Sequence, residues 1–484
     1  MGLTGPSDAI AVSGAPSAAS RRLLPWLVAV AFFMESLDTT ILNTAVPAIS
    51  SALHVGPLSM KAVLASYTLS LAVFIPISGW VADRFGTRRV FAAAIALFTL
   101  GSFLCGISSN IHLLVACRIL QGCGGSMMVP VGRLTLVRTF AKSDLLRTMS
   151  FVSIPALIAP MLGPIAGGLI VDYFHWRVIF FVNIPIGLAG LILVYLHLPD
   201  YREETHPLDT VGLILFGSGI ALLSYVLEVF GEHTLSVREI LGLLVVSLAL
   251  LAGYWLHAKS LAFPLLQLGL FKIRTFRAAV NGSFFTRLGI GGVPFLLPLL
   301  YQVGLGFTPV QSGLLIMPQA LAAMSMKAVM PRILKAVGYR WVLISNTIVL
   351  GLLLLLFATI GLHTPVWVIV LQAFFYGAFT SLQYTSMNTL VYADTTDQES
   401  SAASSIASTM QQMSISFGVA TAGLATAFFV PVGGQSGPSA MIHGIHKALV
   451  ALGALTVVST IVFRSLKRGD GDAVSNEKVF HPGG

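Results

Sequence analysis

Charge is what this sequence has least of. Only 10% of its 484 residues are Asp, Glu, Lys or Arg, whereas a soluble domain carries about 25%. Hydrophobic residues make up 56% of the chain, and the mean hydropathy is +0.87. This composition excludes an ordinary soluble domain and predicts a polytopic membrane protein.

Sequence patterns of catalysis and of metal binding are also missing. The three cysteines, Cys105, Cys117 and Cys123, lie in apolar segments without metal-ligand spacing, which indicates buried thiols rather than a disulfide framework. The histidines are scattered, and there is no nucleophile motif or phosphate loop. We therefore expect neither an enzyme nor a bound metal or cofactor.

Long apolar runs, by contrast, are abundant. Runs of about 20 residues, enough to cross a bilayer, centre near residues 35, 71, 97, 124, 160, 188, 220, 248, 290, 320, 350, 378, 415 and 454. The sequence thus predicts an all-α fold with fourteen transmembrane helices. An even number of spans places both termini on one side of the membrane.

Basic residues are distributed unevenly between the predicted loops. Twenty lie on the side of the termini, and only Lys61, Arg177, Arg238 and Lys447 lie on the other. The positive-inside rule therefore predicts cytoplasmic termini. Because the net charge of +9 follows the loops and forms no basic stripe with interleaved aromatics, it gives no support for a nucleic-acid partner.

Composition shifts divide the chain into five parts. We expect a disordered cytoplasmic tail (1–20), a six-helix bundle (21–199), a linker with two extra spans (200–258), a second six-helix bundle (259–468) and a disordered tail (469–484). The polar stretch 200–209 marks the linker. Residues 261–277 mix apolar and basic side chains, which predicts an amphipathic segment on the inner surface.

The two bundles carry a faint internal repeat. Gly79–Arg89 follows the second span and Met330–Arg340 follows the tenth, and both are basic hairpins with a central glycine. These positions match when the chain is divided into six, two and six spans. A transporter core with pseudo-two-fold symmetry is the natural inference.

Two carboxylates interrupt the first apolar run. Glu35 and Asp38 are three residues apart, so they share one face of a helix. A carboxylate at bilayer depth costs about 2.5–3.5 kcal/mol on insertion scales. Such a residue usually faces a cavity, a partner or a proton path, which makes this pair the best pointer to mechanism.

Four motifs resemble the major facilitator superfamily, and more narrowly its fourteen-span drug:proton antiporters, from about Arg21 to Arg468. The first span matches at Leu37, Asp38, Thr40, Ile41, Asn43, Ala45 and Pro47. The loop motif matches at Gly79, Asp83, Arg84, Gly86 and Arg88, with Val81 and Thr87 departing from it. The fourth span matches at Arg118, Gln121 and Gly122, and the fifth at Gly163, Pro164, Gly167 and Gly168. The stretches 129–135 and 386–390 resemble multidrug transporters of the MdtD type.

The resemblance implies a major facilitator fold and proton-coupled export of small amphipathic compounds by alternating access. It implies that Arg118 is coupled to proton movement and that the fifth-span motif serves exchange rather than cotransport. The loop motif would act as an inner gate, in which Asp83 accepts from a helix N-terminus or pairs with a neighbouring arginine. We expect a monomer in the bacterial cytoplasmic membrane, with protons, lipid and a small molecule as its partners.

We expect Asp38 to be the principal proton-binding group, with Glu35 as a second site or a cavity-wall residue. A substrate cavity is predicted from residues of both bundles: Phe33, Asn43, Gln121, Arg287, Gln319, Lys327, Tyr376 and Gln383. Arg287 and Lys327 favour an alternative, an exporter of an anionic metabolite or metal chelate. They could also snorkel or pair with a carbonyl. A non-transporting membrane sensor is a more distant alternative.

Overall fold

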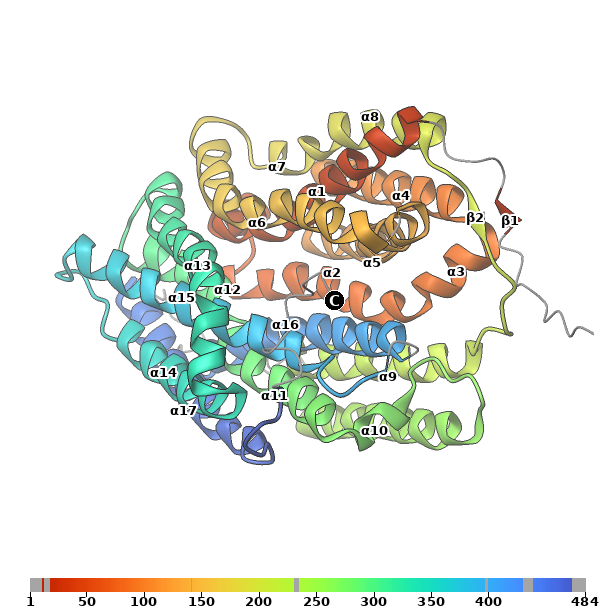
Figure 1. The fold of residues 1–484 in the computed structure, drawn as a ribbon. Helices are drawn as coiled ribbons and strands as arrows, with labels where there is room; N and C mark the ends of the chain where they lie inside the picture. Colours follow the sequence, from red (N-terminus) through yellow and green to blue (C-terminus); the bar gives the residue numbers. More distant parts are fainter. Residues whose placement is uncertain are drawn as a thin grey trace, which may run out of the picture.

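The chain forms two helical bundles that lie side by side, with an extra helical hairpin against one flank (Figure 1). The computed structural model describes residues 11–12, 18–140, 142–229, 235–396, 399–429 and 438–471. Within these ranges, fourteen helices are long and apolar enough to cross a membrane. The fourteen predicted spans are therefore confirmed.

The first bundle, called the N lobe below, contains six of these spans. Its helices are α1 (Ala18–Ala52), α2 (Lys61–Phe74), α3 (Ser78–Phe85), α4 (Thr87–Ile107), α5 (Ile111–Thr139), α6 (Lys142–Tyr173), α7 (Val178–Phe181) and α8 (Asn183–His197). Two short 3-10 turns, Pro57–Met60 and Ile75–Ile77, join α1 to α2 and α2 to α3.

The second bundle, the C lobe, repeats this arrangement after the hairpin of α9 (Thr210–Val229) and α10 (Val237–Ser260). Its helices are α11 (Arg274–Ile290), α12 (Val293–Leu299), α13 (Pro309–Val337), α14 (Tyr339–Phe357), α15 (Val366–Leu390), α16 (Ser400–Phe429) and α17 (Pro438–Phe463). A 3-10 turn, Leu268–Lys272, precedes α11, and a π-helical turn, Leu300–Gly304, follows α12.

Helix pairings in the two lobes match each other. In the N lobe α1 packs on α6, α4 on α5, α2 on α5 and α4 on α8. The spans at the same positions in the C lobe form the same four pairs: α11 packs on α16, α14 on α15, α13 on α15 and α14 on α17. The lobes meet along α6 with α13 and along α2 with α16, which are again equivalent pairs. This is the pseudo-two-fold core predicted from the repeat.

The repeated basic hairpins turn on a glycine in each lobe. Gly86 has φ 96° between α3 and α4, and Gly338 has φ 81° between α13 and α14. Side chains other than glycine rarely adopt this conformation. The same backbone solution thus joins the second and third spans of each lobe.

Helix α9 lies against α2 and α16, along one of the two seams between the lobes. At its end, the carbonyl oxygen of Glu228 accepts a hydrogen bond from Lys61 Nζ at 2.7 Å. Lys61, predicted to lie on the outer side, is only 1% exposed. It is buried because α9 and α16 cover the first turn of α2.

Segments next to the lobes also differ from expectation. Ala11 and Val12 form β1, which pairs antiparallel with β2 (Tyr201–Arg202), and α1 already begins at Ala18; the other residues of the predicted tail 1–20 lie outside the described ranges. In the tail 469–484, of which 469–471 are described, Asp470 pairs with Arg274. In the predicted amphipathic segment 261–277, Leu266, Leu270 and Phe276 are buried in the C lobe, whereas Lys272 and Arg277 are exposed.

Candidate functional site: a buried ion pair and a cavity between the lobes

Asp38 lies inside the N lobe, in contact with two other spans. Its Oδ2 accepts from Arg118 Nη1 on α5 at 2.6 Å. Its Oδ1 accepts from Gln121 Nε2 at 2.8 Å and from Asn183 Nδ2 on α8 at 2.9 Å. Asp38 and Arg118 are each 1% exposed, so the ion pair is fully buried and hydrogen-bonded, as a buried charge requires.

A second set of contacts fixes the partners of Asp38. Gln121 Nε2 also donates to Ser102 Oγ on α4 at 2.8 Å, and its Oε1 accepts from Arg118 Nη1 at 2.7 Å. The guanidinium carbon of Arg118 lies 4.2 Å from the centre of the Tyr67 ring on α2. Side chains of five spans therefore belong to one network around Asp38, with α5 and α8 in direct contact with its carboxylate and α2 and α4 joined through Arg118 and Gln121.

Sequence reasoning missed three members of this network. Asn183, Ser102 and Tyr67 were not predicted as site residues, and Gln121 was placed in the cavity. The spacing of three residues between Arg118 and Gln121 could have indicated that Gln121 belongs to the network, because residues three apart share a helix face. Asn183 gave a weaker one, as a polar residue inside an otherwise apolar stretch.

Glu35 stays outside this network. It is half-buried one turn before Asp38 on α1, and no hydrogen bond or ion pair within the described residues involves its carboxylate. Arg133, an exposed residue of α5, lies over the ring of Phe32 at 5.5 Å. The two carboxylates thus have different surroundings, and only Asp38 has a direct cationic partner.

The loop motif forms a charge cluster within the N lobe. Arg138 Nη2 contacts Asp83 Oδ1 at 2.8 Å and Glu203 Oε1 at 2.6 Å. Of the two predicted roles of Asp83, the structure shows the pairing with an arginine. Gly79 is exposed, with open space where a side chain would extend, so no close helix contact requires a glycine at this position.

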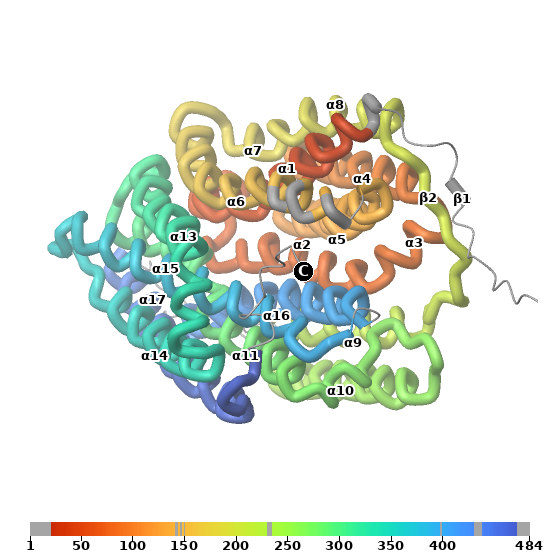
Figure 2. The backbone as a smooth tube through the Cα atoms, in the orientation of Figure 1, coloured from red at the N-terminus to blue at the C-terminus, as the bar shows by residue number. Residues whose placement is uncertain are grey.

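The linker passes α3 and the start of α4 (Figure 2). Asp200 Oδ1 accepts from the backbone N–H of Arg88, in the first turn of α4, at 3.2 Å. Trp80 Nε1 donates to the carbonyl of His206 at 2.7 Å. The side chains of Arg84 and Arg88 form no ion pair among the described residues, so Arg138 is the cation that the cluster uses.

The fifth-span motif brings three helices close together. A Cβ on Gly163 or Gly167 would overlap α1 at Thr40 or Ile41. On the other side of α6, a Cβ on Gly168 would overlap the backbone of Pro309, and one on Gly313 of α13 would overlap the carbonyl of Pro164. These glycines allow α6 to contact α1 and the C lobe at backbone distance.

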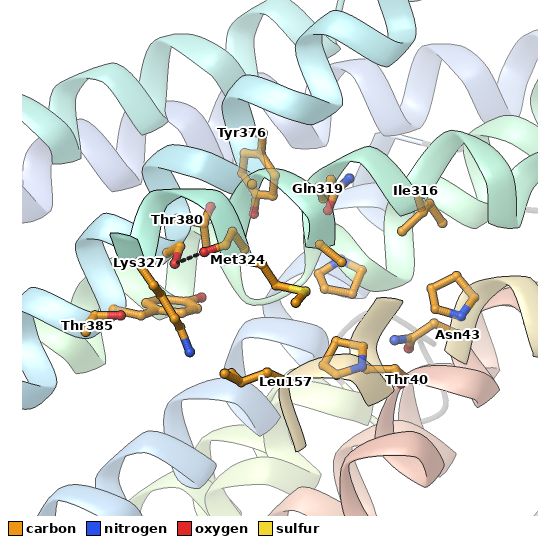
Figure 3. A pocket seen from close by; sticks show the side chains of 18 of the residues that line it. Thr40, Asn43, Leu157, Ile316, Gln319, Met324, Lys327, Tyr376, Thr380 and Thr385 are labelled. Atoms are coloured by element: carbon orange, nitrogen blue, oxygen red, sulfur yellow. Dashed lines mark hydrogen bonds between the residues drawn. The ribbon is translucent and has the colours of Figure 1, made fainter. Parts of the chain in front are cut away.

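A cavity of about 400 Å³ lies between the lobes, next to these helices (Figure 3). Thr40 and Asn43 of α1 and Leu157 of α6 line it from the N lobe. The C-lobe wall includes Arg287, Gln319, Lys327, Tyr376, Thr380, Tyr384, Asn388 and Gln411. Asp38 precedes Thr40 by two residues, which turns it to the opposite side of α1.

Five of the eight predicted cavity residues line this space: Asn43, Arg287, Gln319, Lys327 and Tyr376. The structure places the other three elsewhere. Gln121 binds Asp38, Gln383 is buried and hydrogen-bonded to Asn346 and Thr347, and Phe33 is not part of the lining. No group of three His, Cys, Asp or Glu within the described residues could hold a metal ion.

The sequence of residues 28–419 matches the family model of the Major Facilitator Superfamily. The chain belongs to this superfamily of membrane transporters.

Its relatives cover most of its length. It is 43% identical over 399 residues to a Serratia proteamaculans (strain 568) protein named "Putative multidrug resistance protein MdtD", covering 82% of this chain and 84% of the relative. An Escherichia coli O81 (strain ED1a) protein of the same name is 42% identical over 410 residues, covering 85% and 87%. A solved POT family transporter in complex with 5-aminolevulinic acid shares the fold, with a TM-score of 0.66 at 17% identity over 91% and 95% of the two chains.

Proposed function

We propose that this protein is a proton-coupled antiporter that exports small amphipathic compounds from the bacterial cytoplasm by alternating access. The observation that carries the proposal is the buried Asp38–Arg118 ion pair, which lies on the side of α1 opposite the cavity between the lobes. The relatives named as multidrug resistance proteins support the export of diverse compounds. Both termini are assigned to the cytoplasm by the loop charges.

Protonation of Asp38 would remove the negative charge that balances Arg118. Breaking a buried ion pair costs about 3–5 kcal/mol because one charge is left uncompensated. The protonated and ionised forms should therefore favour different packings of α1 against α5. This gives two states whose populations depend on proton binding, which antiport requires.

The membrane potential can drive such a cycle, since each charge that crosses it contributes about 2.3 kcal/mol per 100 mV. Glu35 is a candidate for the group that passes the proton on, because it lies one turn from Asp38 and has no direct partner among the described residues. The close contacts of Gly168 and Gly313 would hold the lobes together at one end of the cavity. The Asp83–Arg138–Glu203 cluster would act on the gate at the opposite end.

The proposal is tested in inside-out membrane vesicles with an acidic lumen. Three fluorescent probes are offered: the cation ethidium, uncharged N-phenyl-1-naphthylamine and the anion 8-anilino-1-naphthalenesulfonate. The wild type should accumulate at least one probe, and collapse of the pH gradient should abolish the uptake. Asp38→Asn should lose this uptake and Asp38→Glu should retain part of it.

Glu204→Gln is the matched control, because Glu204 is an exposed carboxylate of the linker and should leave uptake unchanged. Gradient-driven uptake by Asp38→Asn at the wild-type rate would remove Asp38 from the coupling role. A wild type that binds a probe without moving it would favour the sensor instead.

A further inference from the structure

The cavity between the lobes has a one-sided charge. Among the described residues that line it, Arg287 and Lys327 are cationic and none is a carboxylate. Asp38 is on the other side of α1 and already paired with Arg118. A site for lipophilic cations should avoid such charges. The charge of the cavity therefore favours negatively charged compounds.

Arg287 is held rigidly, at a depth where an unpaired charge is costly. It is only 3% exposed, and no described carboxylate forms an ion pair with it. Its Nε donates to Ser283 Oγ, one turn earlier on α11, at 3.0 Å. Its guanidinium carbon lies 3.5 Å from the centre of the Tyr384 ring, so one face of the guanidinium is stacked on the ring.

This arrangement leaves donors of Arg287 for a ligand. A guanidinium carries five N–H donors in a planar fork, and the bond to Ser283 uses the one on Nε. The stacked ring occupies a face and not the edge of the fork. The edge of the fork suits two oxygens of one anionic group, the geometry that favours arginine over lysine for carboxylates and phosphates.

Lys327 supplies a second charge from another helix. It lies on α13, and Figure 3 shows its side chain extending into the cavity on the side of Leu157. A lysine is a flexible point charge, so it can meet a second anionic oxygen in varied positions. Met324 and Ile316 line the same space and give an apolar body somewhere to pack.

We propose that Arg287 and Lys327 form an anion-binding subsite, which selects amphipathic compounds with a carboxylate, sulfonate or phosphate group. Only the transport of such compounds rests on the proposed function; their binding does not. Arg287 is the principal contact, stacked on Tyr384, and Lys327 adds a weaker attraction because it is more exposed. The alternative is that Arg287 has only a structural role, in which it contacts Ser283 and Tyr384 and binds no ligand.

Equilibrium binding to the purified full-length protein in lipid nanodiscs tests the subsite without a gradient. The probes are 8-anilino-1-naphthalenesulfonate and N-phenyl-1-naphthylamine, which differ by the sulfonate group alone, and empty nanodiscs correct for partition into lipid. The wild type should bind the sulfonate at least tenfold more tightly. Arg287→Gln should weaken sulfonate binding about 10- to 100-fold, the usual value of a hydrogen bond to a charged group.

Binding of the neutral probe should stay within about twofold in Arg287→Gln. Lys327→Gln, at an exposed position where folding is not at stake, should weaken sulfonate binding about three- to tenfold and leave the neutral probe unchanged. Arg287→Lys should keep part of the sulfonate preference. These results would show that both residues bind the ligand through their charge rather than through packing.

Equal losses for both probes in Arg287→Gln, with no selective loss in Lys327→Gln, would overturn the subsite. So would a wild type without preference for the sulfonate. Gradient-driven uptake of ethidium or the neutral probe, together with equal binding of the sulfonate and the neutral probe in nanodiscs, would leave the antiporter standing and remove the subsite. Selective sulfonate binding without uptake of any probe would do the reverse.

Discussion

Arg118 and Asp38 form a 2.6 Å ion pair between two helices of one lobe, not between the lobes. A rocking movement of two rigid lobes therefore leaves this pair intact. In the proposed cycle, protonation would instead act on the packing of α1 against α5, and α1 also carries the cavity residues Thr40 and Asn43. The first span thus links the charge of Asp38 to the wall of the cavity.

Removal of either partner of this pair should be costly, and removal of both should be less so. Asp38→Asn and Arg118→Gln should each lower the free energy of unfolding by about 3–5 kcal/mol, because each leaves a buried group without its counter-charge. The double variant should lose less than the sum by about 1–3 kcal/mol. Unfolding of the four purified proteins in denaturant measures this; additive losses would show that the ion pair contributes no coupling.

The Asp83–Arg138–Glu203 cluster should behave differently because two carboxylates share one arginine. Asp83→Asn or Glu203→Gln alone should cost about 0–1 kcal/mol, since the other carboxylate still pairs with Arg138. The double variant should lose about 1–3 kcal/mol, because Arg138, only 10% exposed, then has no anionic partner. Thermal unfolding at low salt compares the set. A double variant no worse than the sum would mean that the carboxylates act independently.

The number of spans and the repeat could be predicted because they depend on local properties. Apolar runs of bilayer length need no tertiary information, and the two basic hairpins share a glycine whose turn is set by its own backbone. The burial of Lys61 could not be predicted in this way. Its cover comes from α9 and α16, which are distant in the sequence.

The site could be predicted only in part, for a related reason. Asp38 and Arg118 stand out as charges in apolar runs, whatever the packing. Asn183 is uncharged and 145 positions from Asp38, and its contact depends on how α8 packs on α1. The exclusion of Gln383 from the cavity follows from the neighbours Asn346 and Thr347 on α14, which no spacing within α15 reveals.

Gly313→Ala should disturb the contact between the lobes. A Cβ at this position would overlap the carbonyl oxygen of Pro164, and a backbone atom cannot move aside as a flexible side chain can. We expect the free energy of unfolding to fall by about 1–3 kcal/mol. We also expect a pH gradient across proteoliposomes to collapse faster, because α6 and α13 are forced apart. Gly242→Ala is the control, since open space surrounds that glycine in α10. Equal behaviour of the two variants would show that the seam tolerates the change.

Acid should weaken the attachment of the extra hairpin through Asp209, which precedes α9. Burial raises the pKa of its carboxyl, but hydrogen bonds from His257 and from the backbone N–H groups of Gly212 and Leu265 outweigh it and hold the pKa below its ordinary value of 3.8. A depressed folded-state pKa stabilises the fold at pH values above the ordinary pKa. This stabilisation is lost as the pH falls through the lower, folded-state value.

Asp209→Asn isolates the contribution of this charge, because asparagine can still cap α9 through its side-chain oxygen. Its thermal midpoint should lie below that of the wild type at neutral pH, and the difference should shrink as the pH is lowered through about 4 to 3. Glu204→Gln should instead follow the wild type at every pH, since no described hydrogen bond depends on that carboxylate. A difference between Asp209→Asn and the wild type that stays constant down to pH values below about 3 would show that the loss is one of packing and not of charge.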